Sequence, residues 1–134
     1  MVIDFVDPRS VDGWDAALAA AGDRSFFHTA AWAAVLSESY RYEPLYQARE
    51  SGPGFDLVMP LMEVRSSLTG LRGVSLPFAD HCLPFAAESG LVEEARAKAM
   101  DYGRKAGWKF IEWRDGGPSA AERPAHETYF THRI

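Results

Sequence analysis

A long, regularly patterned segment between two short apolar runs constrains the fold of this chain most strongly. Ser89 is a good N-cap for a helix and Gly107 is a stop signal. Between them, apolar residues recur at helical spacing and form a predicted stripe of Val92, Ala95, Ala99, Tyr102 and Ala106. The runs 71–76 and 108–114 on either side have the composition of strands. Two strands joined by such a helix usually pair in parallel, through a right-handed crossover. The sequence therefore predicts a βαβ unit in the second half of the chain.

The first half predicts a short strand and two helices. Val2–Val6 is an apolar run of the length typical of an edge strand. A first helix is expected to end at Gly22, and a second to cover Ala30–Tyr40 with Thr29 as its N-cap. Neither segment carries an internal proline, which agrees with a helix at both places.

Antiparallel strands are expected between the two halves. Pro44–Glu50 and Phe55–Arg65 are extended runs joined by Ser51-Gly52-Pro53-Gly54, which is a hairpin signal. The second run is apolar on both faces, so it is expected to be a covered central strand. Pro60 cannot donate to a β-ladder and predicts a bulge or a local gap there. The element order is thus β-α-α-β-β-β-loop-α-β-β, with a last strand at 128–134, which is a mixed α/β fold: a twisted mixed sheet flanked by helices on both faces.

Composition limits the classes of function. The 134 residues suffice for one domain, and a net charge of −5 disfavours non-specific binding of nucleic acid. The single cysteine, Cys82, excludes an internal disulfide and a multi-cysteine zinc site, and the scattered histidines match no metal-ligand spacing. The N-terminus lacks the features of a signal peptide, and no apolar run is long enough to be a transmembrane segment. We therefore expect a soluble, cytoplasmic protein without a metal.

The residues with the greatest chemical potential lie together in Asp80-His81-Cys82, in a loop between a predicted strand and the long helix. Three interpretations are open. Asp80 could orient or deprotonate an amine, Cys82 could be a thiolate nucleophile with His81 as its base, or all three could be structural. Adjacent side chains of an extended backbone point to opposite faces, which disfavours the Cys82–His81 pair.

Two other segments have both a functional and a structural interpretation. Arg104-Lys105-Ala106-Gly107 looks like the Arg-x-x-Gly-x-Gly/Ala loop with which acetyltransferases bind a pyrophosphate. Such a loop has to open a helix, whereas this one closes a helix, where Arg, Lys and Gly are expected for structural reasons. Tyr40-Arg41-Tyr42 could form the rim of a substrate site or merely end a helix.

Several segments, taken in order, resemble the N-terminal part of the FemAB-like branch of the GNAT acyltransferase superfamily. The segments that carry the resemblance are Ser25–Trp32 (SFFHTAAW), Tyr42–Tyr46 (YEPLY), Met59–Leu61 followed by Arg65, and Val74–Cys82 (VSLPFADHC), with weaker likeness at Glu112–Arg114 and Tyr129–His132. The resemblance implies a GNAT-like half-domain that helps to transfer an acyl or aminoacyl group to an amine. The acceptor would be a peptidoglycan precursor or a surface glycan, which is a role in cell wall biogenesis.

The resemblance also implies roles for individual residues. The family motif carries over onto Asp80 as the residue that orients the acceptor, with His81 beside it as a second catalytic residue. We expect the substrate to contact a further set of residues, namely Phe78, Cys82, Arg65 and Arg114. No cofactor-binding residue is expected in this chain.

FemAB-like proteins contain two GNAT-like units, and this chain, 1–134, matches the opening part of the first. The donor, acyl-CoA or an aminoacyl-tRNA, would be bound by the second unit, so the chain by itself is expected to be inactive and to be a piece of a longer protein. The alternative is a non-catalytic module that binds a glycan or peptide. Such a module could also pair with a second copy or another chain through the strand at 128–134.

Overall fold

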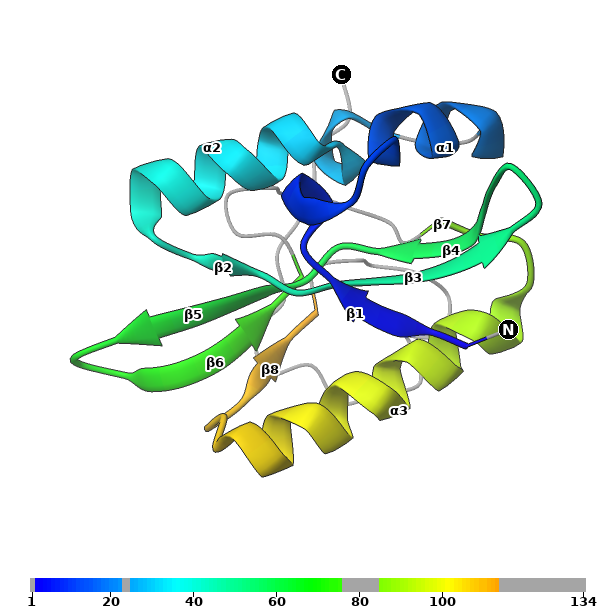
Figure 1. Ribbon diagram of the computed structural model, residues 1–134. Coiled ribbons are helices and arrows are strands. Elements are labelled where there is room, and N and C mark those ends of the chain that lie inside the picture. Colours follow the sequence, from blue (N-terminus) through cyan, green and yellow to red (C-terminus); the bar gives the residue numbers. More distant parts are fainter. Residues whose placement is uncertain (1, 23–24, 76–84, 114–134) are drawn as a thin grey trace, which may run out of the picture.

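The computed structural model describes residues 2–22, 25–75 and 85–113, and Figure 1 shows their arrangement. The α-helices, 3₁₀ turns and strands in these ranges are β1 (Asp4–Val6), η1 (Pro8–Ser10), α1 (Trp14–Ala21), η2 (Phe26–His28), α2 (Ala30–Tyr40), β2 (Glu43–Pro44), β3 (Tyr46–Ser51), β4 (Gly54–Met59), β5 (Met62–Ser66), β6 (Gly70–Val74), β7 (Phe85–Ala86), α3 (Ser89–Ala106) and β8 (Ile111–Glu112). The predicted last strand at 128–134 lies outside the described residues.

The strands form two four-stranded sheets between layers of helices. Their strand orders are β1-β3-β4-β7 and β2-β5-β6-β8. Helices α1 and α2 lie on one side of the sheets and α3 on the other (Figure 1). The pairing is antiparallel throughout the described strands except between β6 and β8, which are parallel and joined through α3. The structure thus confirms the mixed α/β fold and the parallel strand pair joined by the long helix.

The predicted strand Phe55–Arg65 is wrong as a single element. It breaks at Pro60 and Leu61, so that β4 belongs to one sheet and β5 to the other. Proline has no N–H to donate, and the carbonyl of Leu61 accepts a hydrogen bond from the N–H of Leu45 at 2.8 Å, at the same break between β2 and β3. The gap expected at Pro60 is therefore the boundary between the two sheets.

The predicted strand at 108–114 is shorter in the structure, where β8 covers only Ile111–Glu112. The residues before β8 still bond to β6, because the N–H of Lys109 donates to the carbonyl of Leu71 at 2.9 Å and the N–H of Gly73 donates to the carbonyl of Phe110 at 3.3 Å. The indole of Trp108 packs between α3 and β6: a Cβ on Gly73 would lie 2.2 Å from Trp108, and one on Gly103 would lie 2.5 Å from it. The short strand β7 was not expected at all. It pairs with Leu57 and Val58 of β4, residues nearly thirty positions earlier.

Two apolar clusters hold the layers together. Trp14, Leu18 and Leu36 of α1 and α2 pack on one face of the sheets with Val58 and Met62. On the other face, α3 packs Leu91 and Ala95 against Ile3, Leu57 and Met59. The buried face of α3 is thus close to the predicted stripe, but it begins at Leu91 rather than Val92, and Ala106 is exposed.

The start of α2 and the end of α3 match the capping signals in the sequence, whereas Ser89, predicted to cap α3, is its first residue and Glu88 occupies the N-cap position. Thr29 Oγ1 accepts the N–H of Trp32 at 3.3 Å and so caps α2, and α3 ends at Gly107, whose φ of 81° is left-handed. Arg104 and Lys105 accordingly occupy the last turn of α3, as the structural interpretation of that segment required. Among the described residues, no helix has the length and apolar character needed to span a membrane.

Candidate functional site

The carboxyl ends of β6 and β8 lie side by side next to the boundary between the sheets. The N–H of Ser75, directly after β6, donates to the carbonyl of Glu112 at 2.9 Å. On the other side of residues 76–84, Phe85 begins β7, which pairs with β4 of the other sheet. In α/β sheets, ligands bind beyond the carboxyl ends of parallel strands, where the strand order changes. Ser75, Phe85 and Glu112 therefore mark a candidate site.

Most of the residues predicted to act chemically lie outside the described ranges. Asp80 and His81, and the predicted substrate contacts Phe78 and Cys82, belong to residues 76–84, and Arg114 follows the last described residue. The structure places the two residues that flank the segment 76–84, namely Ser75 and Phe85. Ser75 is buried, and Phe85 is half-buried against the core cluster beneath α1 and α2.

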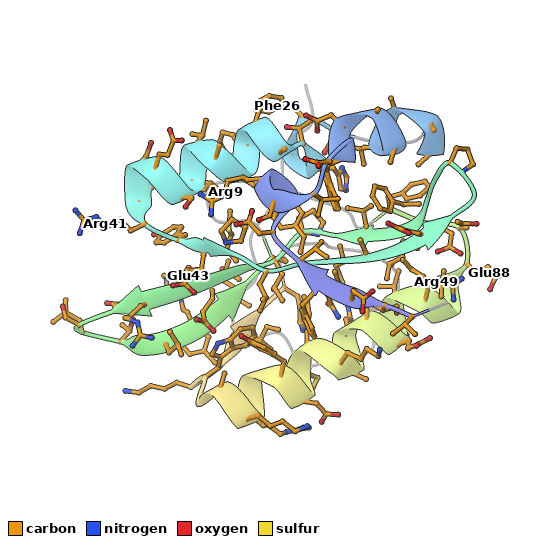
Figure 2. The ribbon with its side chains drawn as sticks, viewed as in Figure 1. Arg9, Phe26, Arg41, Glu43, Arg49 and Glu88 are labelled. Carbon is orange, nitrogen blue, oxygen red and sulfur yellow. The ribbon has the colours of Figure 1, made fainter. Side chains whose placement is uncertain are left out.

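Arg65, the remaining predicted substrate contact, is exposed on β5 and lines a cavity of about 330 Å³. We call this the β2–β5 cavity; its lining residues are Tyr40, Arg41, Glu43, Glu63 and Arg65. Figure 2 shows Arg41 projecting outward from the end of α2, and Glu43 on β2, which pairs with β5. The segment that could form a substrate rim, Tyr40-Arg41-Tyr42, thus contributes its first two residues to a cavity, and it also ends α2.

Two carboxylates face each other in this cavity. Glu43 of β2 is the direct partner of Glu63 in the antiparallel pair, and Glu63 and Arg65 share one face of β5 because they are two residues apart. In the pairing of β5 with β6, Glu63 is opposite Gly73 and Arg65 is opposite Leu71. The lining residues of the β2–β5 cavity on β5 therefore lie alongside β6.

The position of Glu63 is fixed by Trp108. The indole Nε1–H of Trp108 donates to Glu63 Oε2 at 2.7 Å. The same indole is confined between Gly73 and Gly103, and the ring of Tyr102 meets it edge-on at 5.4 Å between centroids. Burial, together with the negative charges of Glu63 and Glu43, raises the pKa of Tyr102. The charges of the two glutamates therefore act on the phenol of Tyr102 on α3.

Sequence reasoning found Arg65 but missed Glu43, Glu63 and Trp108. One signal was available: Glu63 and Arg65 are charged and lie on the same face of β5, and they alternate with the apolar residues Met62 and Val64. The pairing of Glu63 with Glu43 could not be read in the same way, because it depends on the register of β2 against β5.

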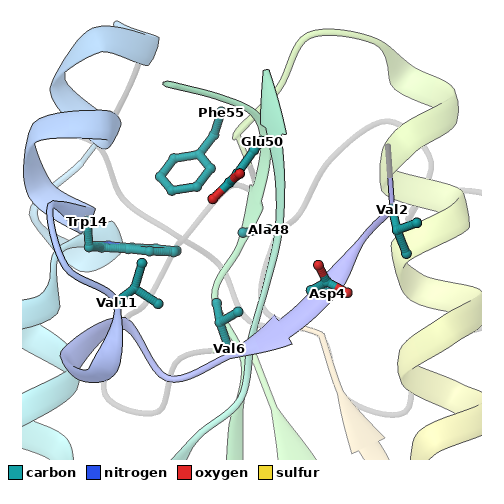
Figure 3. Close-up of a pocket in the computed structure, with 8 residues that line it drawn as sticks. All are labelled: Val2, Asp4, Val6, Val11, Trp14, Ala48, Glu50 and Phe55. Carbon is teal, nitrogen blue, oxygen red and sulfur yellow. The ribbon is translucent and has the colours of Figure 1, made fainter. Parts of the chain in front are cut away.

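A second cavity, of about 260 Å³, lies between β1 and α1 (Figure 3). Trp14, Phe55 and Val11 form its apolar wall, and Asp4 and Glu50 bring carboxylates to it. None of its lining residues is among the catalytic or substrate-binding residues predicted from the sequence. Over the described ranges, no three His, Cys, Asp or Glu side chains come together in a way that could hold a metal ion.

Comparisons with known proteins support the fold. No family model matches the sequence, and no curated protein matches it. Among solved structures, the chain is similar to the crystal structure of a ribosomal-protein-alanine N-acetyltransferase from Brucella melitensis biovar Abortus 2308, with a TM-score of 0.56 and 12% identity over 100% of both chains. At this identity the likeness concerns the fold and not the substrate. The chain therefore shares its mixed α/β fold with this N-acetyltransferase.

Proposed function

We propose that this protein is an N-acyltransferase, which moves an acyl group from a thioester or ester donor to an amine. The observation that carries the proposal is the parallel pair β6–β8. Its strands are connected through α3, and it lies next to the boundary between the two sheets. That arrangement belongs to a fold shared with a protein named for N-acetyl transfer. It also provides the kind of position at which α/β sheets bind their ligands.

Asp80 and His81 are the proposed catalytic residues. They belong to the segment that leaves β6 at Ser75 and returns at Phe85. In the reaction the amine nitrogen attacks the donor carbonyl, a C–N bond forms, and the C–S or C–O bond to the leaving group breaks. The amine has to lose a proton, which Asp80 or His81 accepts and can return to the leaving group. General acid–base catalysis of this kind contributes about 10²–10⁴-fold in rate.

The finer assignment is a FemAB-like acyltransferase, and its support is the sequence pattern between Ser25 and Cys82. On this proposal the donor is acyl-CoA or an aminoacyl-tRNA and the acceptor is an amine of a peptidoglycan precursor or surface glycan, in the cytoplasm. Arg65 contacts the substrate from the β2–β5 cavity. Phe78, Cys82 and Arg114 are proposed as further contacts.

The experiment uses the full-length gene product with acetyl-CoA or alanyl-tRNA as donor. The acceptors are a peptidoglycan-precursor pentapeptide, an amino sugar and a peptide with a free N-terminal alanine, and mass spectrometry detects the acylated amine. We expect one donor–acceptor pair to give a product that accumulates with time and enzyme concentration. No product from any pair, with the acceptors nevertheless bound, would overturn the proposal in favour of a non-catalytic binding module.

A further inference from the structure

The β2–β5 cavity carries charges of both signs that the protein does not neutralise internally. Within the described residues, the side chains of Arg41, Glu43 and Arg65 make no hydrogen bond or ion pair, and the carboxylate of Glu63 bonds only to the neutral indole of Trp108. We propose that this cavity binds a ligand that carries an ammonium and a carboxylate on one molecule, as an amino acid or a dipeptide does. The binding does not depend on the proposed acyl transfer; if that function holds, the ligand is its amine acceptor.

The ammonium would bind between Glu43 and Glu63. Like charges directly opposite each other on neighbouring strands destabilise a sheet, and these two glutamates are direct partners. An ammonium group removes that repulsion, because it can donate charge-assisted hydrogen bonds to both carboxylates. Their shared negative potential already acts on Tyr102.

The structure holds one of these carboxylates in place in advance. Glu63 accepts a 2.7 Å hydrogen bond from Trp108, whose ring has no room to turn because Gly73 and Gly103 lie against it. A side chain that is already oriented loses little conformational entropy when a ligand binds. A merely solvated surface glutamate needs no such arrangement.

The carboxylate of the ligand would bind to Arg41 and Arg65. A guanidinium group presents a planar fork of donors that fits a carboxylate in a bidentate manner. Arg41 is the one non-glycine residue in the described part of the chain with a positive φ, 59°, and its N–H donates to Ser37 at 2.9 Å. Its backbone is therefore held at the end of α2, two residues before Glu43, and it lines the cavity.

The size and the charge of the cavity limit the ligand. A volume of about 330 Å³ is at the lower end of the range for small-molecule sites, which suits a dipeptide. A simple anion would be attracted by the two arginines but repelled by the two glutamates, and a simple cation would experience the reverse. A molecule with both groups satisfies both halves of the site.

The test is a titration of the ¹⁵N-labelled full-length protein with L-alanyl-L-alanine, followed by NMR. The indole N–H of Trp108 reports on Glu63 directly, and a Trp108→Phe variant assigns its signal. We expect a saturable shift of this signal and of the amides of Glu43 and Arg65. The N-acetylated and the C-amidated dipeptides should each bind at least about tenfold more weakly, because each lacks one charged contact. No shift, or equal binding of the capped dipeptides, would overturn the proposal.

Matched variants locate the site. Glu63→Gln and Arg65→Gln should each weaken binding of the dipeptide about tenfold. Glu50→Gln, in the cavity between β1 and α1, and Arg104→Gln, in the last turn of α3, should leave it unchanged. Weaker binding in Glu50→Gln with full binding in Glu63→Gln would contradict the assignment. Since the readout is binding, it is independent of whether any acyl group is transferred.

Discussion

Trp108 illustrates how a single side chain determines which residues its neighbours can be. Its ring lies where the Cβ atoms of Gly73 and Gly103 would otherwise project, at 2.2 Å and 2.5 Å. We expect Gly73→Ala to lower the free energy of unfolding by about 2–3 kcal/mol, because the ring has to move out of a packed position. Urea denaturation measures the loss.

Two comparisons isolate that cause. Gly90→Ala, at a helix position where no heavy atom lies within 4 Å of the new Cβ, should be neutral or slightly stabilising. In a Trp108→Ala background, Gly73→Ala should lose most of its cost, because the obstacle is gone. An unchanged cost in that background would show that Trp108 is not the reason for glycine at position 73.

Arg49 and Asp56 form an ion pair at the irregularity in the β3–β4 ladder. Nε and one terminal nitrogen of Arg49 donate to the two carboxylate oxygens of Asp56 at 2.8 Å and 2.5 Å. The hydrogen bonds from Arg49 lower the pKa of Asp56. The pair therefore stabilises the fold above the unfolded-state pKa of Asp, about 3.9, and this contribution disappears as the pH falls through the lower folded-state pKa.

The corresponding prediction concerns acid unfolding. Between about pH 4 and pH 2, the free energy of unfolding should fall less steeply in Asp56→Asn than in the natural protein. Arg49→Gln should flatten the same part of the curve, since it removes the hydrogen bonds that lower the pKa. Urea titrations at several pH values give the curve. Equal slopes in all three proteins would mean that the ion pair does not contribute in this range.

Helix α2 depends on its N-cap. Thr29 Oγ1 accepts the N–H of Trp32 and donates to the carbonyl of Phe26 at 2.6 Å, so the side chain joins α2 to η2. Thr29→Ala should cost about 1 kcal/mol of stability, as the loss of an N-cap usually does, and Thr29→Ser should restore most of it. Thermal and urea unfolding of the two variants measure the difference. If serine were as destabilising as alanine, the methyl group and not the hydroxyl would be what matters.

Helices were predictable from the sequence because their signals are local. Ala30–Tyr40 has the predicted bounds, and α3 begins one residue earlier than predicted, at Ser89. A cap, a periodic apolar face and a stop signal are local features of such a segment. The sheets were predictable only in part. Pro60 indicated a gap, but which sheet each half joins is decided by partners far away in the chain, as the pairing of Phe85 with Val58 shows.

The same distinction applies to the candidate site. Arg65 could be singled out in the sequence, whereas the opposition of Glu43 and Glu63 follows from a register that no local pattern sets. Trp108 reads as a core residue of a strand, and its hydrogen bond to Glu63 depends on two glycines in different elements. Asp80 and His81 remain predictions.

At the scale of the molecule, the described residues form two sheets with helices on both sides and one parallel strand pair. The fold is shared with an N-acetyltransferase over the full length of both chains. The proposed chemistry assigns acyl transfer to the segment between Ser75 and Phe85. The stability of the fold, in contrast, depends on the apolar clusters under α1, α2 and α3. Function and stability should therefore respond separately to substitutions in that segment.

The most direct measurement compares Asp80→Asn with a surface control, Asp101→Asn, in the full-length protein, with the transfer rate and the thermal midpoint determined on the same samples. Asp101 belongs to an exposed i,i+3 pair with Arg104 on α3. We expect Asp80→Asn to lower the rate by about 10²–10⁴-fold at an unchanged midpoint, and Asp101→Asn to change neither. A full rate in Asp80→Asn, or a loss of rate that follows a loss of folded protein, would contradict the assignment of Asp80 to catalysis.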